Sequence, residues 1–302
     1  MELANVRVVA DGLMFPEGPV AMPDGSVVVV EIHAGRLTRI DPDGRKSILA
    51  VTGGGPNGAA IGPDGAFYVC NNGGLSNTGA HLNNGGSIQR VDVASGKVET
   101  LYTQCDSSPL LWPNDIVFDS TGNFWFTDFA GDAIYYAAPD GSKIVQAVAG
   151  ATAANGIGLS PDGRTLYWAQ THSRQVIRRR LSDHGQLIES AGYSVLSLAR
   201  YGQLNPDALL AGLPGARELD SLAVDGAGYV CVGTVIESGI SVISPDGQSV
   251  ELWTLPSALA DLFVTNICFG GPGLKTAYIT CSEKGRLVAC DWPRAGLKLA
   301  FG

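Results

Sequence analysis

The sequence of 302 residues lacks any apolar run near the ~18 residues that a membrane-spanning helix requires. Its first residues, Met-Glu-Leu-Ala-Asn-Val-Arg, have neither the basic nor the apolar region of a secretion signal. Positive charge is scarce, and a net charge of −9 disfavours binding to the phosphates of a nucleic acid. We therefore expect a cytoplasmic protein that binds neither membranes nor nucleic acids.

Paired cysteine spacing is also absent, because none of the six cysteines forms a Cys-x-x-Cys motif. Most lie in apolar strand patterns, and we interpret them as small buried side chains in a reducing compartment. Cys105 is expected in a loop, where its neighbours Gln104 and Asp106 provide no cation to lower the pKa of its thiol. No Gly-x-Ser-x-Gly motif is present either. Catalysis by a cysteine thiolate or by such a serine is therefore not expected.

Glycine is abundant, with 40 residues, while only 16% of the residues are charged. This composition is typical of short strands joined by many turns. The stretch from Glu17 to Val30 is the clearest example: an apolar run precedes Pro23-Asp24-Gly25, and four valines follow. Glycine accepts the positive φ that such a turn requires, so this stretch predicts a strand, a turn and a second strand.

This strand-turn-strand pattern returns five times, and each copy begins at a carboxylate or carboxamide. Eight residues after the first five of these polar residues stands a glycine: Gly25, Gly65, Gly122, Gly163 and Gly228. In the sixth copy the glycine, Gly273, comes one residue early. The six polar residues are Glu17, Asn57, Asn114, Asn155, Asp220 and Asn266.

Weaker strand patterns, such as Arg36–Ile40 and Ser87–Val91, follow the copies and complete units of four strands. Six such units predict an all-β fold, a six-bladed β-propeller forming one domain over residues 1–302. Little chain remains after the sixth copy, so we expect Val6-Arg-Val-Val to close the ring as a blade strand. If the first strand of each blade runs along the central channel, all six polar residues begin at one mouth. The long segments 71–86, 103–113 and 197–219 fall on that same side, where function usually lies.

Two carboxylates and four carboxamides near one axis form a site of hard oxygen ligands. Such a site suits one divalent ion, Ca²⁺ or Mg²⁺, with Mn²⁺ or Zn²⁺ as substitutes. The alternative is that each Asn or Asp only begins a strand and bonds its own backbone in an Asx-turn. Glu17 fits that alternative poorly, because glutamate is a weak turn former.

Several motifs resemble the senescence marker protein (regucalcin)/gluconolactonase family. They are Phe15-Pro-Glu-Gly-Pro, Pro113-Asn-Asp, Asn155-Gly-Ile, Asp220-Ser-Leu-Ala-Val-Asp-Gly and Val264-Thr-Asn-Ile-Cys-Phe-Gly-Gly-Pro-Gly-Leu-Lys-Thr-Ala-Tyr-Ile-Thr. The resemblance covers nearly the whole chain and extends to the calcium-dependent diisopropylfluorophosphatase and paraoxonase propellers. It implies a six-bladed propeller with a divalent metal in its channel, for which Ca²⁺ is the first candidate. It also implies Glu17, Asn155 and Asp220 as metal ligands, and Asn114 as a ligand or substrate contact.

The expected activity is hydrolysis of a lactone, with the metal polarising the carbonyl and Asp220 activating a water or attacking directly. A carboxylate against a divalent ion is a weak base, so a hydroxide on the metal is the competing nucleophile. A phosphotriesterase-like activity and a non-catalytic ligand-binding propeller are the alternatives.

The small-molecule substrate is expected to be less polar than a simple sugar lactone. Sugar-lactone members of the family often carry Arg two residues before the asparagine that is Asn114 here, whereas this chain has Trp112. An Asp-Gly pair of the family is replaced by Asp220-Ser221. The further candidate substrate contacts on the same rim are Phe15, His33, Asn57, His172 and Asn266.

Overall fold

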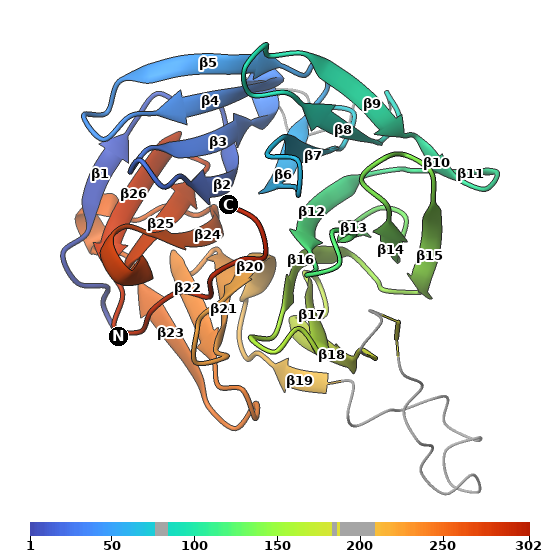
Figure 1. Ribbon diagram of the computed structural model, residues 1–302. Helices are drawn as coiled ribbons and strands as arrows, with labels where there is room; N and C mark the ends of the chain where they lie inside the picture. The colour runs from blue at the N-terminus through green and yellow to red at the C-terminus, as the bar shows by residue number, and fades with distance from the viewer. Residues whose placement is uncertain (76–83, 183–185, 188–208) are drawn as a thin grey trace, which may run out of the picture.

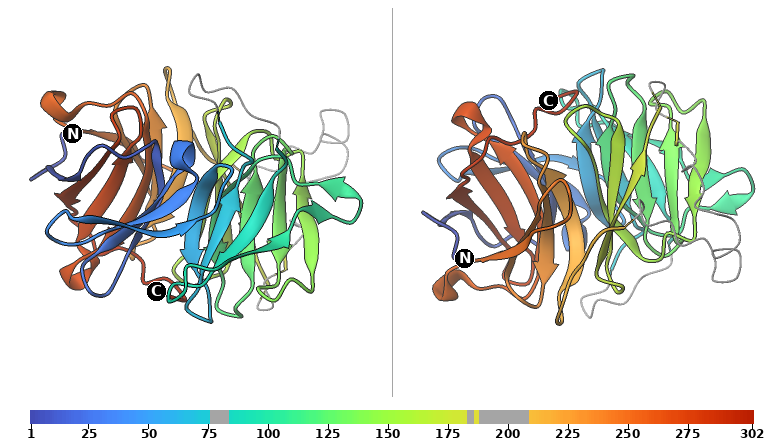
Figure 2. Two further views of the ribbon diagram at one scale, coloured as in Figure 1. Left: turned by 90° about the horizontal axis from the view of Figure 1, so that it is seen from above. Right: turned by 90° about the horizontal axis from the view of Figure 1, so that it is seen from below.

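The computed structural model describes residues 1–75, 84–182, 186–187 and 209–302. These residues form six four-stranded antiparallel sheets arranged as blades around one central axis (Figure 1). Side views show a thick disc with turns and loops at its two faces (Figure 2). The prediction of an all-β, six-bladed propeller is confirmed. None of the helices in the described part of the chain is long and apolar enough to cross a membrane.

Each of the first three blades is a run of four consecutive strands that follow one another from the axis outward. Blade one contains β2 (Pro16–Ala21), β3 (Val27–Glu31), β4 (Arg36–Ile40) and β5 (Lys46–Val51). Blade two contains β6 (Pro56–Ile61), β7 (Phe67–Asn71), β8 (Ser87–Val91) and β9 (Val98–Tyr102). Blade three contains β12 (Pro113–Phe118), β13 (Phe124–Asp128), β14 (Ala133–Ala137) and β15 (Ile144–Ala149).

The other three blades follow the same plan, except that the last one takes its outer strand from the start of the chain. Blade four contains β16 (Ala154–Leu159), β17 (Thr165–Gln170), β18 (Gln175–Arg180) and β19 (Leu209–Gly212). Blade five contains β20 (Glu218–Val224), β21 (Val230–Val235), β22 (Gly239–Ile243) and β23 (Val250–Thr254). Blade six contains β24 (Val264–Gly270), β25 (Thr276–Cys281), β26 (Arg286–Asp291) and β1 (Arg7–Ala10).

Strand β1 pairs with β26, with Arg7 opposite Ala289, so the expected N-terminal closing strand is confirmed. A short hairpin, β10 (Gln104–Cys105) with β11 (Ser108–Pro109), projects from the rim between blades two and three (Figure 1). It contains Cys105, which was expected in a loop. The thiol is buried, and burial raises its pKa. The described residues also include three 3-10 turns: η1 (Ile32–Ala34), η2 (Ser257–Leu259) and η3 (Pro272–Leu274).

The core lies between the blades. Each of the six interfaces between neighbouring blades holds its own cluster of buried apolar side chains, which the alternation of residues along the strands supplies from both sheets. At the interface of blades one and two, for example, Val28 and Leu37 pack with Phe67. All six cysteines are free thiols, and five of them are buried.

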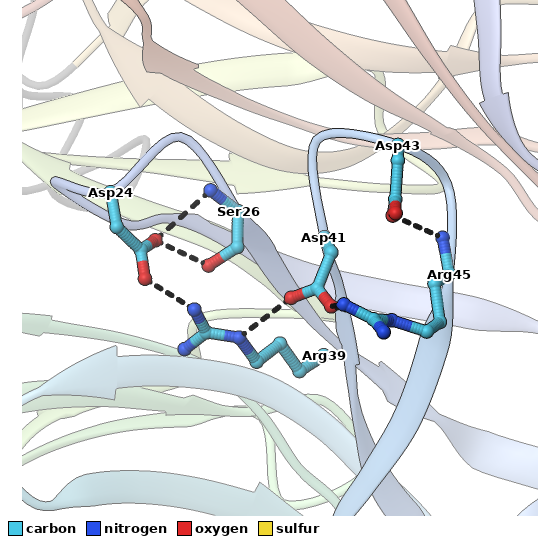
Figure 3. A network of polar contacts seen from close by, with 6 residues as sticks. All are labelled: Asp24, Ser26, Arg39, Asp41, Asp43 and Arg45. Carbon is cyan, nitrogen blue, oxygen red and sulfur yellow. Dashed lines mark hydrogen bonds and ion pairs between the residues drawn. The ribbon is translucent and has the colours of Figure 1, made fainter.

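The turn glycines of the repeat behave as predicted. Gly25, Gly65, Gly122, Gly163 and Gly228 all have φ between 67° and 89°. The turn aspartate beside the glycine bonds its own backbone, as Figure 3 shows for blade one. There Asp24 accepts hydrogen bonds from the Ser26 amide (3.1 Å) and hydroxyl (2.6 Å) and pairs with Arg39, which also reaches Asp41 of the next turn at 3.1 Å.

Candidate functional site

The six polar residues that begin the inner strands all lie at one level of the channel. Neighbouring inner strands contact one another in the order β2, β6, β12, β16, β20 and β24, and β24 closes the circle onto β2. In every blade the pairing between the first and second strand is irregular at this level. Such bulges redirect side chains, and they often occur beside active sites. We call this level the polar ring; its members are Glu17, Asn57, Asn114, Asn155, Asp220 and Asn266.

Glycines at the position after the polar residue allow the inner strands to approach closely. A Cβ atom on Gly58 would lie 2.5 Å from the carbonyl oxygen of Asn114, and one on Gly156 would lie 2.4 Å from the amide of Leu222. Both distances are far shorter than real Cβ contacts, so a side chain here would force the blades apart. The inner strands therefore lie close together at the level of the polar ring, and the channel is narrow there.

Hydrogen bonds link ring residues to one another and to neighbouring side chains. The amide of Asn266 donates to Oε2 of Glu17 at 3.0 Å, and the hydroxyl of Ser221 donates to Oδ1 of Asn155 at 3.4 Å. The Asn155 amide in turn donates to the hydroxyl of Thr171 at 3.3 Å. Oδ1 of Asn114 is buried and has no hydrogen-bond partner among the described residues. These contacts differ from the Asx-turns of the opposite rim, where Asp24 accepts from the backbone two residues on.

A third carboxylate, Asp115, enters the same space, although the repeat pattern did not predict it. Asp115 occupies the position that is glycine in three other copies, and its side chain is 6% exposed. Its oxygens accept from the amides of Ile116 at 2.9 Å and Ile157 at 3.3 Å. The sequence did contain a signal for Asp115, because a charged residue stands there at the position where three other copies have glycine.

The buried carboxyl groups have raised pKa values. Burial raises the pKa of Glu17 to about 7, against hydrogen bonds from Thr265, Gly18 and Asn266 that lower it. Burial also raises the pKa of Asp115 to about 7, and the nearby charge of Glu17 adds to the shift. The pKa of Asp220 is raised well above its ordinary range by burial, and next by the charge of Glu17. The three groups thus share one buried, negatively charged space.

A divalent cation fits this arrangement. The space combines the buried carboxyl groups of Glu17 and Asp115 and the half-buried one of Asp220 with amide oxygens, one of which, Oδ1 of Asn114, lacks a partner among the described residues. Within the described ranges, no three Asp, Glu, His or Cys side chains meet closely enough to hold a metal by themselves. A cation here would therefore need the asparagine oxygens as well, which is the donor set of a hard cation such as Ca²⁺.

An apolar collar surrounds this mouth of the channel. The ring of Trp112 lies 5.2 Å from that of Phe129, which lies 5.7 Å from the ring of His172. In blade one, Phe15 contacts His33 at 5.0 Å and Phe263 at 6.0 Å. All these residues flank the starts of inner strands or the ends of second strands. The collar also includes three exposed aliphatic side chains: Met14, Leu111 and Leu262.

The two candidate histidines differ in environment. His33 is half-buried, and burial lowers its pKa. Its Nε2 atom has no hydrogen-bond partner among the described residues. His172 is exposed and lies 3.6 Å from the carboxylate of Glu218. The structure therefore places both on the expected rim, one against Phe15 and one against Phe129.

A second set of polar residues, also missed in the sequence, anchors the loops of the collar. Both oxygens of Asp128, at the end of β13, accept from the backbone amides of Leu111 (2.8 Å) and Trp112 (2.7 Å). Glu31, at the end of β3, accepts from the Met14 amide at 2.7 Å, and Asp261 accepts from the Phe263 amide at 2.8 Å. Their partners are loop residues 2 to 17 positions away, which strand patterns alone do not indicate.

Comparison with known proteins places this geometry in a family. Residues 15–283 match the family model described as SMP-30/Gluconolactonase/LRE-like region. The chain belongs to this family. The predicted resemblance is thereby confirmed, and the match spans all six residues of the polar ring.

Curated relatives and solved structures agree with the assignment. The chain is 28% identical over 198 residues to "Lactonase drp35" of Staphylococcus haemolyticus, and 29% identical over 206 residues to that of Staphylococcus aureus strain MW2. These matches cover 63% and 65% of this chain but only 58% of each relative.

Two solved structures share the fold across most of their length. A gluconolactonase of Xanthomonas campestris superimposes with a TM-score of 0.75 at 22% identity, covering 96% of this chain and 90% of its own. A calcium-binding protein, regucalcin, of Agrobacterium tumefaciens superimposes with a TM-score of 0.73 at 18% identity, covering 98% of both chains. At these identities the likeness concerns the fold.

Proposed function

We propose that this protein hydrolyses a lactone that carries apolar substituents. It would use a divalent cation at the polar ring, and Ca²⁺ is the first candidate for that cation. The observation that carries the proposal is the burial of Glu17 and Asp115 in one narrow channel with the half-buried Asp220, beside the unpartnered oxygen of Asn114. Buried carboxylates are normally paired or bound to a metal. The relatives named as lactonases supply the reaction class.

Glu17, Asn155, Asp220 and Asn114 would hold the cation, because they bring two charges and two amide oxygens from four different blades. The chemistry that the cation supplies when bound is polarisation of the lactone carbonyl. Asn57 and Asn266 are then left to orient the substrate by hydrogen bonds. Asp115 lies at the level of the ring and would add negative charge that strengthens cation binding.

Asp220 is the proposed catalytic residue. It would accept a proton from the water that attacks the carbonyl carbon, after which the ring C–O bond breaks and a hydroxy acid forms. Burial raises the pKa of Asp220 in the cation-free site, whereas a bound cation would lower it, so hydroxide supplied by the cation remains the competing nucleophile. The proton would then pass to the departing alkoxide, so that atoms and charge balance over the reaction.

The apolar collar supports the choice of substrate. Trp112 and Phe129 form one wall and Phe15 with Phe263 forms another, while His33 and His172 lie at their edges. Burial of apolar substituents against such walls stabilises the complex by ~25 cal/mol per Å². Sugar hydroxyls facing these rings would lack partners, which costs roughly 1–3 kcal/mol each.

The test is a turnover assay of the purified protein on matched panels. Alkyl- and aryl-substituted lactones, aldonolactones and phosphotriesters would be compared by pH-stat, before and after chelation and after Ca²⁺ is restored. We expect turnover of lactones, apolar ones fastest, that is lost on chelation and regained with Ca²⁺. Turnover of phosphotriesters alone would instead assign the phosphotriesterase alternative, and turnover of none of the three panels by the Ca²⁺-loaded protein would assign a binding propeller.

A further inference from the structure

A cavity of about 380 Å³ lies on the far side of the polar ring, toward the mouth that holds the turn glycines. We call it the rear chamber. All six inner strands contribute apolar side chains to its wall, one example from each strand being Val20, Ile61, Ile116, Leu159, Val224 and Phe269. Its volume falls within the range of ~300–1,000 Å³ that is usual for small-molecule sites.

The chamber is polar only at its ends. Asp115 and Asn266 border it at the level of the ring, while Asp119 and Asp162 lie at the outer mouth. Lys298 is the one basic side chain among its lining residues, and it is exposed to solvent. An anionic ligand would therefore meet an excess of like charge, whereas an uncharged apolar chain would not.

Residues 297–302, which we call the closing segment, cross the outer mouth of this chamber (Figure 1). At one side the amide of Leu297 donates to the carbonyl of Val224 in blade five at 3.3 Å. At the other side the ring of Phe301 meets that of Phe118 in blade three edge-on, with centroids 5.9 Å apart. Between these anchors the side chain of Leu299 is 55% exposed.

We propose that the rear chamber binds the alkyl chain of an uncharged amphiphile, with its polar end at Asp115 and its chain under the closing segment. The six apolar walls favour hydrocarbon, and the carboxylate of Asp115 can accept a hydrogen bond from a hydroxyl. This site is distinct from the collar, because it opens at the other mouth. The inference does not depend on lactone hydrolysis, since binding is measured without a lactone.

The experiment is calorimetric titration of the whole protein with n-butanol, n-hexanol and n-octanol. We expect the affinity to rise about fourfold for each added methylene, equivalent to ~0.8 kcal/mol, until the chamber is full. Binding should show a negative heat-capacity change, which marks burial of apolar surface. An affinity that does not depend on chain length would overturn the proposal.

Variants show at which mouth of the channel the alcohol binds. Ala223→Leu narrows the chamber and should weaken octanol binding at least tenfold. Leu299→Ala, at a position that is 55% exposed, removes an apolar side chain over the chamber and should weaken octanol binding several-fold even if Ala223→Leu does not fold. Ile48→Ala, an exposed apolar residue on the outer strand β5, is the matched control and should change nothing. If Phe263→Ala weakens octanol binding and Leu299→Ala does not, the alcohol binds the collar and the proposal is wrong.

Discussion

The side-chain amide of Asn266 donates a hydrogen bond of 3.0 Å to Oε2 of Glu17, across 249 positions of sequence. It joins the last inner strand to the first at the level of the polar ring. Asn266 thereby holds one oxygen of Glu17, while Oε2 also accepts from the amide of Gly18 at 3.0 Å. Glu17 is thus fixed in position before any ligand arrives, which favours a preorganised site.

Stability without a divalent cation should fall as the pH rises from about 5 to about 7. The pKa of Glu17 is raised from an ordinary value of 4.5 to about 7, and that of Asp115 from 3.8 to about 7. At a pH between the ordinary and the raised pKa values, the folded protein binds more protons than the unfolded chain. The free energy of unfolding therefore decreases as the pH rises. Melting curves in excess chelator should show this slope, and Ca²⁺ should raise Tm more at pH 7 than at pH 5. A chelated protein whose Tm is equal at both pH values contradicts the prediction.

Replacing Asp115 by Asn should flatten that slope. The amide keeps one acceptor oxygen for Ile116 or Ile157 but does not titrate. The fall in Tm between pH 5 and pH 7 should therefore shrink, and Ca²⁺ binding, followed by calorimetry, should weaken. Asp246→Asn is a suitable control, because Asp246 is a turn aspartate whose pKa is lowered by the Ser244 hydroxyl and the Gln248 amide. An unaltered slope in Asp115→Asn would mean that Asp115 is not among the groups that titrate.

Asp220→Asn should lower kcat for lactones by about 10² to 10⁴-fold, the usual contribution of a positioned general base. The amide is similar in shape, so the fold should survive and the variant should still melt cooperatively. Asp24→Asn, on the opposite rim, serves as the control and should retain activity, because Asp24 bonds only its own turn and Arg39. An Asp220→Asn enzyme with full kcat would exclude Asp220 as the proton acceptor.

Trp112→Arg should narrow the preference for apolar lactones over aldonolactones. The guanidinium offers donors to hydroxyls, and the indole wall beside Phe129 is lost. We expect the ratio of kcat/KM values to fall by roughly tenfold, since one unpaired hydroxyl costs about 1–3 kcal/mol. Wild-type protein that already prefers an aldonolactone to every apolar lactone would refute the role given to Trp112.

Asp128→Asn should change the position of the collar loop at Leu111 and Trp112 and leave the chemical step of hydrolysis unchanged. Each oxygen of Asp128 accepts from a backbone amide, of Leu111 or Trp112, and an Asn side chain can satisfy only one of them. The other amide then faces an NH₂ group, which should cost about 1–3 kcal/mol in unfolding free energy. KM for apolar lactones should rise while kcat changes little. A fall in kcat at unchanged KM would instead indicate a role in the reaction itself.

The repeat and the polar ring could be predicted because each depends on local sequence. A polar residue and the turn glycine eight residues after it mark the two ends of an inner strand. The predicted strand Arg36–Ile40 has the same bounds in the structure. Asp115 was missed because the bulge that turns two successive side chains toward the channel depends on pairing with β13. Asp128 was missed because its partners lie in a loop that precedes the neighbouring strand. The rear chamber depends on how residues 297–302 cross the channel, which no local pattern indicates.

The closing pair, β1 with β26, has a consequence for how the molecule assembles. The two strands are separated by nearly the whole chain, so their contact is among the last that a growing polypeptide can make. Until residues 286–291 have been synthesised, β1 has no strand to pair with, and an unpaired edge invites association with other chains. The same seam is the natural place for the ring to open under heat or force, with blade six separating before the other five blades lose their neighbours.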